Sequence, residues 1–268
     1  MIHPTAILEP GAQLGVDVRI GPYAYVAATA RLGDGCVLGP HAVVLEHTTL
    51  GARCRVHSGA VLGDLPQDLS FKNEPSFVVT GDDCVFREGA TVHRGTKPGT
   101  TTRLGNHVFM MANSHVAHNC EVGDRVIMAN DVLLGGYVIV GERCFFGGSS
   151  AVHQFCHIGR LAMVGALSMI SKDLPPFCTS LSAENSQVGG LNIVGLRRAG
   201  FTADQRAQIK QAFGILYRSG LNTTQAREKL RADTANPFAA EYAEFLANAK
   251  RGICRPSFGN DAELEADA

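Results

Sequence analysis

One apolar residue recurs every six positions from Ile2 to Ile170. In this series, 25 of the 29 positions are Ile, Leu, Val, Met or Phe. The exceptions are Asp68, Glu74, Thr80 and Pro98. An α-helix has a period of about 3.6 residues and a simple strand a period of 2, so neither produces this pattern. A strict period of six indicates short strands joined by tight corners.

Glycine accompanies this repeat. Of the 30 glycines, 25 lie at or before Gly195, and many directly follow the repeating apolar residue, as in Leu32-Gly33 and Val122-Gly123. Glycine turns a corner without the steric cost of a Cβ atom. Stacked coils can then bury the inward side chains in one continuous core, which a single coil cannot form. We therefore predict a mainly β protein, a parallel β-helix over residues 1–195, with loops near 64–78 and 96–103, where the exceptions cluster.

The rest of the chain carries helical signals. Three helix-start patterns follow the repeat: Thr202 with Gln205, Asn222 with Gln225, and Asn236 with Pro237. They predict helices over about 202–218, 222–232 and 236–250, within a small helical domain spanning 196–252. Residues 258–268 contain four acidic residues and no basic one. We predict a disordered tail over 253–268.

Charge and hydropathy exclude several classes of function. Lys and Arg total 24 against 25 Asp and Glu, so the net charge of -1 gives no overall field for nucleic acid or anionic lipid. No window approaches 18 uninterrupted apolar residues, and the first ten residues resemble no secretion signal. We therefore expect a cytoplasmic protein with no nucleic-acid partner and no stable membrane insertion.

Most of the cysteines share one slot of the repeat. Six of the eight lie four residues after an inward position: Cys36, Cys54, Cys84, Cys120, Cys144 and Cys156. Elsewhere this slot holds small residues such as Ala, Ser or Val, and no CxxC pair is present. We interpret these thiols as core fillers that neither catalyse nor bind zinc.

The repeat also aligns three polar or small residues. Hexapeptide-repeat proteins place three repeats in each coil; on that assumption His118, Gly136 and Gln154 form one column, about 4.8 Å apart. A histidine, an unhindered N–H and a carboxamide in this order can act as base, oxyanion donor and substrate anchor. The alternative is a surface histidine beside an ordinary corner glycine. Spacing alone favours this second interpretation.

Other histidines leave further alternatives open. His93 and His153 are ten repeats apart, which predicts that they lie on different faces and share a site only where two subunits meet. His115, His118 and His153 also raise the possibility of a zinc site, because three imidazoles from neighbouring coils can form an open tetrahedral centre.

Five segments, in this order and with a helical C-terminus, resemble the bacterial UDP-N-acetylglucosamine O-acyltransferases of lipid A biosynthesis. They are TVHRGT at 91–96, HVAH at 115–118, AVHQFC at 151–156, DLPP at 173–176 and GLNI at 190–193. The resemblance implies a left-handed β-helix and a homotrimer with active sites between subunits, without a cofactor. It also implies transfer of a 3-hydroxyacyl chain from acyl carrier protein to the 3-hydroxyl of a UDP-sugar.

This resemblance implies roles for particular residues. His118 matches the general base, and Gly136 matches the residue whose N–H would hold the oxyanion. The positions that match substrate contacts or line the cleft are Gln67, Asp68, His93, His115, Tyr137, His153, Gln154 and Asn192. Ala166 matches the position that measures acyl-chain length, while Arg197 and Arg198 match the region that docks the acidic carrier protein.

Five positions depart from the family pattern. Ser70 replaces a basic residue, Asn119 an acid, Tyr137 a histidine, Val194 an acid and Ala199 an arginine. The base and the oxyanion donor are kept while the surroundings of the acceptor change. Three alternatives therefore remain: an acyltransferase for a different UDP-sugar, for example a 3-amino sugar; a zinc enzyme resembling the γ-class carbonic anhydrases; and a non-catalytic trimeric scaffold.

Overall fold

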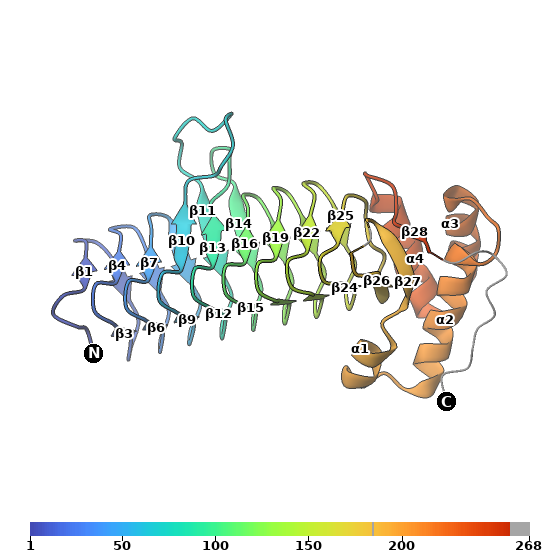
Figure 1. The fold of residues 1–268 in the computed structure, drawn as a ribbon, viewed down its shortest axis with the longest axis horizontal. Helices are drawn as coiled ribbons and strands as arrows, with labels where there is room; N and C mark the ends of the chain where they lie inside the picture. The colour runs from blue at the N-terminus through green and yellow to red at the C-terminus, as the bar shows by residue number, and fades with distance from the viewer. Residues whose placement is uncertain (184, 258–268) are drawn as a thin grey trace.

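The computed structural model describes residues 1–183 and 185–257. Figure 1 shows a long prism of short strands that ends in a group of helices. From β1 to β24, strands pair in parallel with the strands three positions before or after them in the chain, so one coil contributes one strand to each of three sheets. At the end of the third sheet, β26 pairs with β24 in parallel and with β27 in antiparallel orientation. The predicted parallel β-helix with a helical C-terminus is confirmed.

The strands of the described residues fall into three sheets. The first holds β1 (Ile7–Leu8), β4 (Tyr25–Val26), β7 (Val43–Val44), β10 (Val61–Asp64), β13 (Thr91–His93), β16 (His115–Val116), β19 (Leu133–Leu134), β22 (Ala151–Val152) and β25 (Met169–Ile170). The second holds β2 (Gln13–Leu14), β5 (Arg31–Leu32), β8 (Thr48–Leu50), β11 (Phe77–Thr80), β14 (Thr101–Leu104), β17 (Glu121–Val122), β20 (Ile139–Val140) and β23 (His157–Ile158). The third holds β3 (Arg19–Ile20), β6 (Val37–Leu38), β9 (Arg55–Val56), β12 (Val85–Phe86), β15 (Phe109–Met110), β18 (Ile127–Met128), β21 (Phe145–Phe146), β24 (Met163–Val164), β26 (Cys178–Ser180), β27 (Gln187–Leu191) and β28 (Arg255–Pro256).

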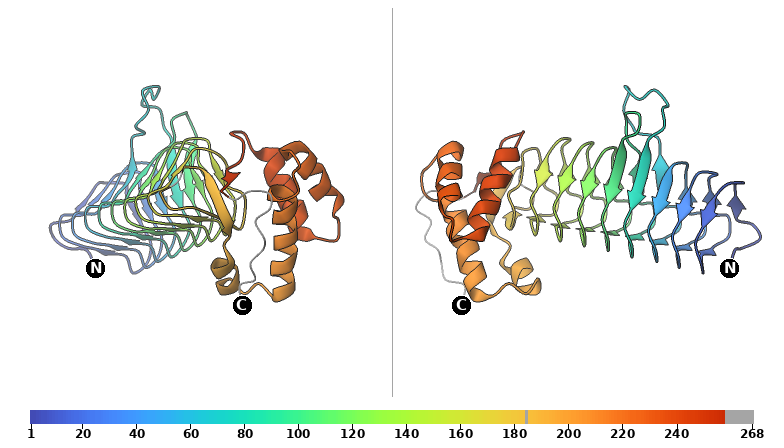
Figure 2. Two further views of the ribbon diagram at one scale, coloured as in Figure 1. Left: turned by 45° about the vertical axis from the view of Figure 1, so that its right-hand side comes forward. Right: turned by 180° about the vertical axis from the view of Figure 1, so that it is seen from behind.

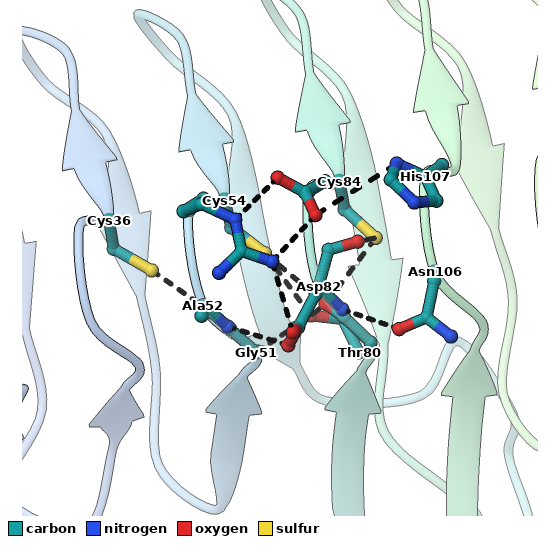
Figure 3. Close-up of polar contacts among 12 residues, drawn as sticks. Cys36, Gly51, Ala52, Cys54, Thr80, Asp82, Cys84, Asn106 and His107 are labelled. Carbon is teal, nitrogen blue, oxygen red and sulfur yellow. Dashed lines mark hydrogen bonds and ion pairs between the residues drawn. The ribbon is translucent and has the colours of Figure 1, made fainter.

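The glycines beside the inward residues make room for the next coil. A Cβ atom on Gly81 would lie 2.5 Å from Oδ1 of Asn106, which accepts a hydrogen bond from the Asp82 N–H at 2.9 Å. One coil earlier, the Ala52 N–H donates to Asp82 Oδ1 at 2.8 Å. Figure 3 shows this ladder of side chains bonded to backbone. Glycine is needed here because the corner side chain of one coil lies against the backbone of its neighbour.

The cysteines pack as predicted. All eight are buried and unpaired. Cys36, Cys54 and Cys84 lie on successive coils, and each thiol donates to the carbonyl of a corner glycine, as Cys36 does to Gly51 at 3.1 Å (Figure 3). Burial raises the pKa of the Cys120 thiol to about 12. A thiol that stays protonated at neutral pH is a poor nucleophile, which supports the interpretation of Cys120 as a core filler.

Two loops leave the prism side by side. Residues 65–76 connect β10 to β11 and residues 94–100 connect β13 to β14, close to the predicted ranges (Figure 1). Thr91 pairs with Val61 and His115 pairs with Thr91, so these two coils span five and four repeats. Most other coils span three repeats. The loops thus add whole repeats to their coils, which is why the sequence period survives them.

These insertions correct one prediction. His93 directly follows Val92, the inward residue of β13, and His153 directly follows Val152, the inward residue of β22. Both strands belong to the first sheet. The two histidines therefore lie in one column, three coils apart. Their predicted placement on different faces is wrong because it assumed three repeats in every coil.

In the described part of the chain, four helices cover the C-terminal end of the prism (Figure 2). They are α1 (Ile193–Arg198), α2 (Ala203–Tyr217), α3 (Thr223–Ala232) and α4 (Pro237–Asn248). Both predicted capping boxes form, at Thr202 and at Asn222, whereas the short helix α1 was not predicted. No helix in the described part of the chain has the length and hydropathy that a membrane crossing requires.

The predicted tail begins too early. Cys254 is buried, and β28 pairs in parallel with β27, so residues 253–257 belong to the folded structure. The strand residues Arg255 and Pro256 lie beside Gln187 and Val188. The part of the predicted tail from 258 to 268 lies outside the described residues.

A buried carboxylate fastens this C-terminal segment to the prism. Asp173 is 1 % exposed, and its two oxygens accept hydrogen bonds from the His157 N–H at 2.7 Å and the Lys250 N–H at 3.0 Å. Nearby, the Arg160 guanidinium forms a bidentate ion pair with Glu241 of α4 at 2.6 and 2.8 Å. The helices are therefore held to the last coils by directed polar contacts.

Asp173→Ala is expected to lower the free energy of unfolding by about 2 to 5 kcal/mol, because it removes a buried carboxylate and leaves the N–H groups of His157 and Lys250 without their acceptor. Urea unfolding followed by circular dichroism measures the loss. Glu228→Ala, at an exposed site on α3, is the control and should change stability by less than about 0.5 kcal/mol. Equal midpoints for the two variants would show that the Asp173 carboxylate does not stabilise this junction.

Candidate active site

A groove of about 680 Å³ runs along the outer face of the first sheet, near the 65–76 loop. Outward-facing residues of successive coils form its floor: Thr91, His115, Leu133, Ala151 and Met169. Gln67 of the loop, His118, Gly136, His153 and Gln154 also line it. Several residues that the sequence marked as functional thus meet in one place.

The predicted column is confirmed by the backbone. The Tyr137 N–H donates to the His118 carbonyl and the Phe155 N–H donates to the Gly136 carbonyl, each at 3.0 Å. His118, Gly136 and Gln154 therefore occupy equivalent corners of three successive coils. They share the edge of the groove where the first sheet turns into the second.

The imidazole of His118 is buried and contacted on both nitrogens. His118 is 7 % exposed. Its Nε2 lies 3.6 Å from Asp68 Oδ2, and its Nδ1 lies 3.1 Å from Asn119 Oδ1. The ring of Tyr137 packs edge-on against it, with centroids 5.3 Å apart. The ring is thus held in one orientation at the wall of the groove.

The His118 imidazole occupies space that only a glycine at position 136 leaves open. A Cβ atom at position 136 would lie 2.2 Å from Cε1 and 2.4 Å from Nε2 of His118. Within the described residues the Gly136 N–H has no hydrogen-bond acceptor. Gly136 therefore leaves space for the His118 ring, and its own N–H is available as a donor beside Nε2.

Asp68 presents a negative charge at the same nitrogen. Its Oδ1 accepts hydrogen bonds from the Ser70 hydroxyl at 2.7 Å and the Ser70 N–H at 2.8 Å. These bonds, with a smaller contribution from His118, lower the pKa of the Asp68 carboxyl. Asp68 is ionised at neutral pH, and Ser70 orients it where the family pattern has a basic residue.

Two further histidines stay uncharged. The rings of His93 and His115 contact edge to face, with centroids 4.7 Å apart, and His115 Nδ1 lies 2.8 Å from Thr91 Oγ1. Burial lowers the pKa of His115 to about 4, helped by repulsion from His93 and His118. Burial also lowers the pKa of His93. They can offer hydrogen bonds to a ligand without adding charge to the groove.

The zinc alternative gains no support from the chain. In the ranges 1–183 and 185–257, no three or more His, Cys, Asp or Glu side chains are arranged to hold a metal ion. His153 Nδ1 faces the Gln154 carbonyl at 3.0 Å. The three histidines proposed as ligands therefore line one groove without converging on one point.

Four predicted residues lie away from His118. Asn192 caps α1, where its Oδ1 accepts from the Gly195 N–H and its Nδ2 donates to the Leu161 carbonyl, both at 2.9 Å. Ala166 occupies the corner between β24 and β25, at the opposite edge of the first sheet from His118. Arg197 and Arg198 are exposed in the last turn of α1. A single chain does not bring these residues to His118.

Two residues beside His118, Thr96 and Asn119, were not predicted as contributors to the site. Thr96 donates to Asn119 through its N–H at 2.9 Å and its hydroxyl at 3.0 Å. From the sequence, Asn119 was noted only because it replaces an acidic residue of the family pattern. Thr96 lies in the segment at 91–96 that carried the resemblance, so its place in that motif was the available signal.

Sequence profiles and known proteins agree with this geometry. Residues 173–254 match the family described as UDP N-acetylglucosamine O-acyltransferase, domain 2, and residues 29–64 and 101–136 match the bacterial transferase hexapeptide repeats. Proteins of Thiobacillus denitrificans and Anaeromyxobacter dehalogenans, both named acyl-[acyl-carrier-protein]--UDP-N-acetylglucosamine O-acyltransferase, are 47% and 46% identical to the chain. Each match covers 95% of this chain and 99% of the relative.

Solved structures show the same relationship. The UDP-N-acetylglucosamine acyltransferase from Campylobacter jejuni superposes with a TM-score of 0.89 at 38% identity, covering 95% of this chain and 99% of that one. These similarities and the hexapeptide repeats identify the fold as a left-handed β-helix with C-terminal helices. The chain belongs to the UDP-N-acetylglucosamine O-acyltransferase family.

Proposed function

We propose that the protein transfers a 3-hydroxyacyl chain from acyl carrier protein to the 3-hydroxyl of UDP-N-acetylglucosamine, the first step of lipid A biosynthesis. The observation that carries the proposal is a buried imidazole, His118, whose Nε2 lies beside the free N–H of Gly136 in a groove. The relatives that match nearly the whole chain carry the name of this reaction.

The reaction needs a base and an oxyanion donor. His118 Nε2 takes the proton of the sugar hydroxyl as its oxygen attacks the thioester carbonyl. The Gly136 N–H donates to the oxygen that becomes negatively charged. When the tetrahedral intermediate collapses, the carbon–sulfur bond breaks and the carrier thiolate takes the proton from the imidazolium. The product is an ester, and the enzyme returns to its starting state.

Asp68 assists the charged stage of this cycle. Its carboxylate lies 3.6 Å from Nε2, the atom that receives the proton. The carboxylate therefore lies close to the positive charge that the ring carries while it holds the proton of the sugar hydroxyl. Direct transfer also needs no acyl-enzyme, which fits thiols that burial keeps protonated.

We propose further that three chains assemble in the cytoplasm with each site between two of them. The support is that Asn192, Ala166 and the two arginines of α1 lie away from His118 in one chain, so that only a neighbour can bring equivalents to it. Exposed apolar side chains also lie near the groove, including Leu133 at 49% and Phe155 at 48%. In the assembly Ala166 would limit acyl length, and Arg197 and Arg198 would dock the acidic carrier protein.

Mass spectrometry of reaction products tests the substrate assignment. The enzyme is incubated with UDP-N-acetylglucosamine, its 3-amino analogue and other UDP-sugars, each with 3-hydroxyacyl carrier proteins of several lengths. The proposal expects UDP-N-acetylglucosamine to gain one 3-hydroxyacyl group. The 3-amino sugar is included because Asn119 and Tyr137 alter the surroundings of the base. Acylation of that analogue alone would overturn the acceptor assignment, and native mass spectrometry of the same sample tests the trimer.

A further inference from the structure

We propose that Asn119 is a positioning residue that sets the tautomer of His118, and that Thr96 and Tyr137 fix the orientation of Asn119. The inference rests on the proposed role of His118 as base. Four side chains make this network, which we call the amide relay; three come from the corners of two successive coils and one from the loop at 94–100: His118, Asn119, Tyr137 and Thr96.

The orientation of the Asn119 carboxamide follows from its neighbours. A backbone N–H can only donate a hydrogen bond, and the Thr96 N–H lies 2.9 Å from one side-chain atom of Asn119. That atom must therefore be the carbonyl oxygen. The Thr96 hydroxyl donates to the same oxygen at 3.0 Å, and the Tyr137 hydroxyl can then donate to Thr96 Oγ1 at 2.9 Å.

The same oxygen dictates the proton position on His118. It lies 3.1 Å from Nδ1, and an amide oxygen can only accept. Nδ1 therefore carries the proton of the neutral ring, and Nε2 keeps its lone pair. Nε2 is the nitrogen beside Asp68 and Gly136, so the relay directs the basic atom toward the groove.

The backbone of Asn119 is also fixed. Its φ of 59° lies in the left-handed region, which Asn adopts more readily than most residues, and its N–H donates to Thr102 Oγ1 at 2.7 Å. Thr96 lies in the loop at 94–100 and Thr102 in β14 directly after it, so this segment holds Asn119 by both its side chain and its backbone. Among residues 1–183 and 185–257, the side chain that contacts Nδ1 is the neutral amide of Asn119, and no carboxylate takes part in the amide relay.

The test compares substitutions at Asn119 with a matched control. Asn119→Ala is expected to lower kcat about 10- to 100-fold with little change in KM, because the ring loses its tautomer preference and its anchor. Asn113→Ala is the control: Asn113 has the same φ of 59° one repeat earlier, is exposed, and has no contact with the relay. Asn113→Ala therefore carries the same conformational cost of placing Ala at a positive φ, and it should retain wild-type kcat.

A second pair of variants separates positioning from simple support of the fold. Asn119→Asp keeps the acceptor and should recover most of the lost kcat. Its charge beside Nδ1 favours the protonated ring, so the acid limb of the kcat/KM profile should move to higher pH. Thr96→Val, which removes one donor to Asn119, should lower kcat about 3- to 10-fold, and it tests the relay if Asn119→Ala does not fold.

Either of two results would overturn the amide relay. The first is that Asn119→Ala has a kcat within twofold of the Asn113→Ala value. If Asn119→Ala does not fold, the same result for Thr96→Val would overturn the relay. The other is Asn119→Asp behaving like Asn119→Ala with an unmoved pH profile. The proposed role of His118 is tested separately. Full turnover by His118→Ala would show that His118 is not the base, whatever the result at Asn119.

Discussion

Replacing His118 by Ala is expected to lower kcat about 10²- to 10⁴-fold, the range for loss of a general base. The melting temperature should change little, since the lost side chain contacts mainly Asn119, Asp68 and Tyr137 around an open groove. Steady-state kinetics with acyl carrier protein and UDP-N-acetylglucosamine, together with calorimetry, measure both quantities. The rate falls because the imidazole that takes the proton is lost.

A distant histidine provides the control for this result. His107 is exposed on the corner that leads into the third sheet, where it faces Asp83 at 4.0 Å. His107→Ala should therefore match the wild-type enzyme in rate. If His118→Ala keeps near wild-type turnover, His118 is not the base and the site must be sought elsewhere.

Gly136→Ala is expected to be nearly as damaging, although it adds only one methyl group. The new Cβ would lie 2.2 Å from Cε1 of His118, far inside contact distance, so the imidazole must move. A displacement of about 1 Å at a reacting group can cost about 10²-fold in rate. We expect a loss of that size in kcat, measured beside the melting temperature, with the fold intact.

Gly148 offers a matched comparison on the same solenoid. It occupies the same slot of its repeat, two residues after an inward side chain, as Gly136 does. A Cβ there would meet only the Asn130 carbonyl oxygen, at an ordinary 3.5 Å. Gly148→Ala should therefore leave kcat unchanged, and equal activity of the two variants would contradict the steric account of Gly136.

The prism could be predicted from the sequence because its rule is local and repeated. Each inward residue fills the same environment as the one six positions away, so 25 agreeing positions specify one architecture. The column of His118, Gly136 and Gln154 followed from this period together with the three repeats per coil of hexapeptide-repeat proteins, and it holds because no loop interrupts the coils between them. Where loops intervene, as between His93 and His153, the count of repeats per coil changes and the rule fails.

The remaining features depend on contacts between distant segments. Asn192 matched a substrate contact, yet in the single chain both ends of its carboxamide are used to cap α1 and to bind Leu161. Because Asn119 replaces an acid, the sequence indicated that His118 loses a partner. In the structure, Thr96 orients the amide oxygen of Asn119 toward His118. Neither arrangement has a periodic signature, because each depends on how a loop or a helix folds back on the coils.

The most direct test of direct transfer follows one labelled acyl group through a single turnover. The enzyme in excess is mixed with acyl carrier protein that carries a radiolabelled 3-hydroxyacyl chain and with UDP-N-acetylglucosamine, and the reaction is quenched at short times. The account predicts that the label passes from carrier protein to nucleotide without residing on the enzyme, and that His118→Ala slows this passage. Label bound covalently to the enzyme before the nucleotide is acylated would contradict it.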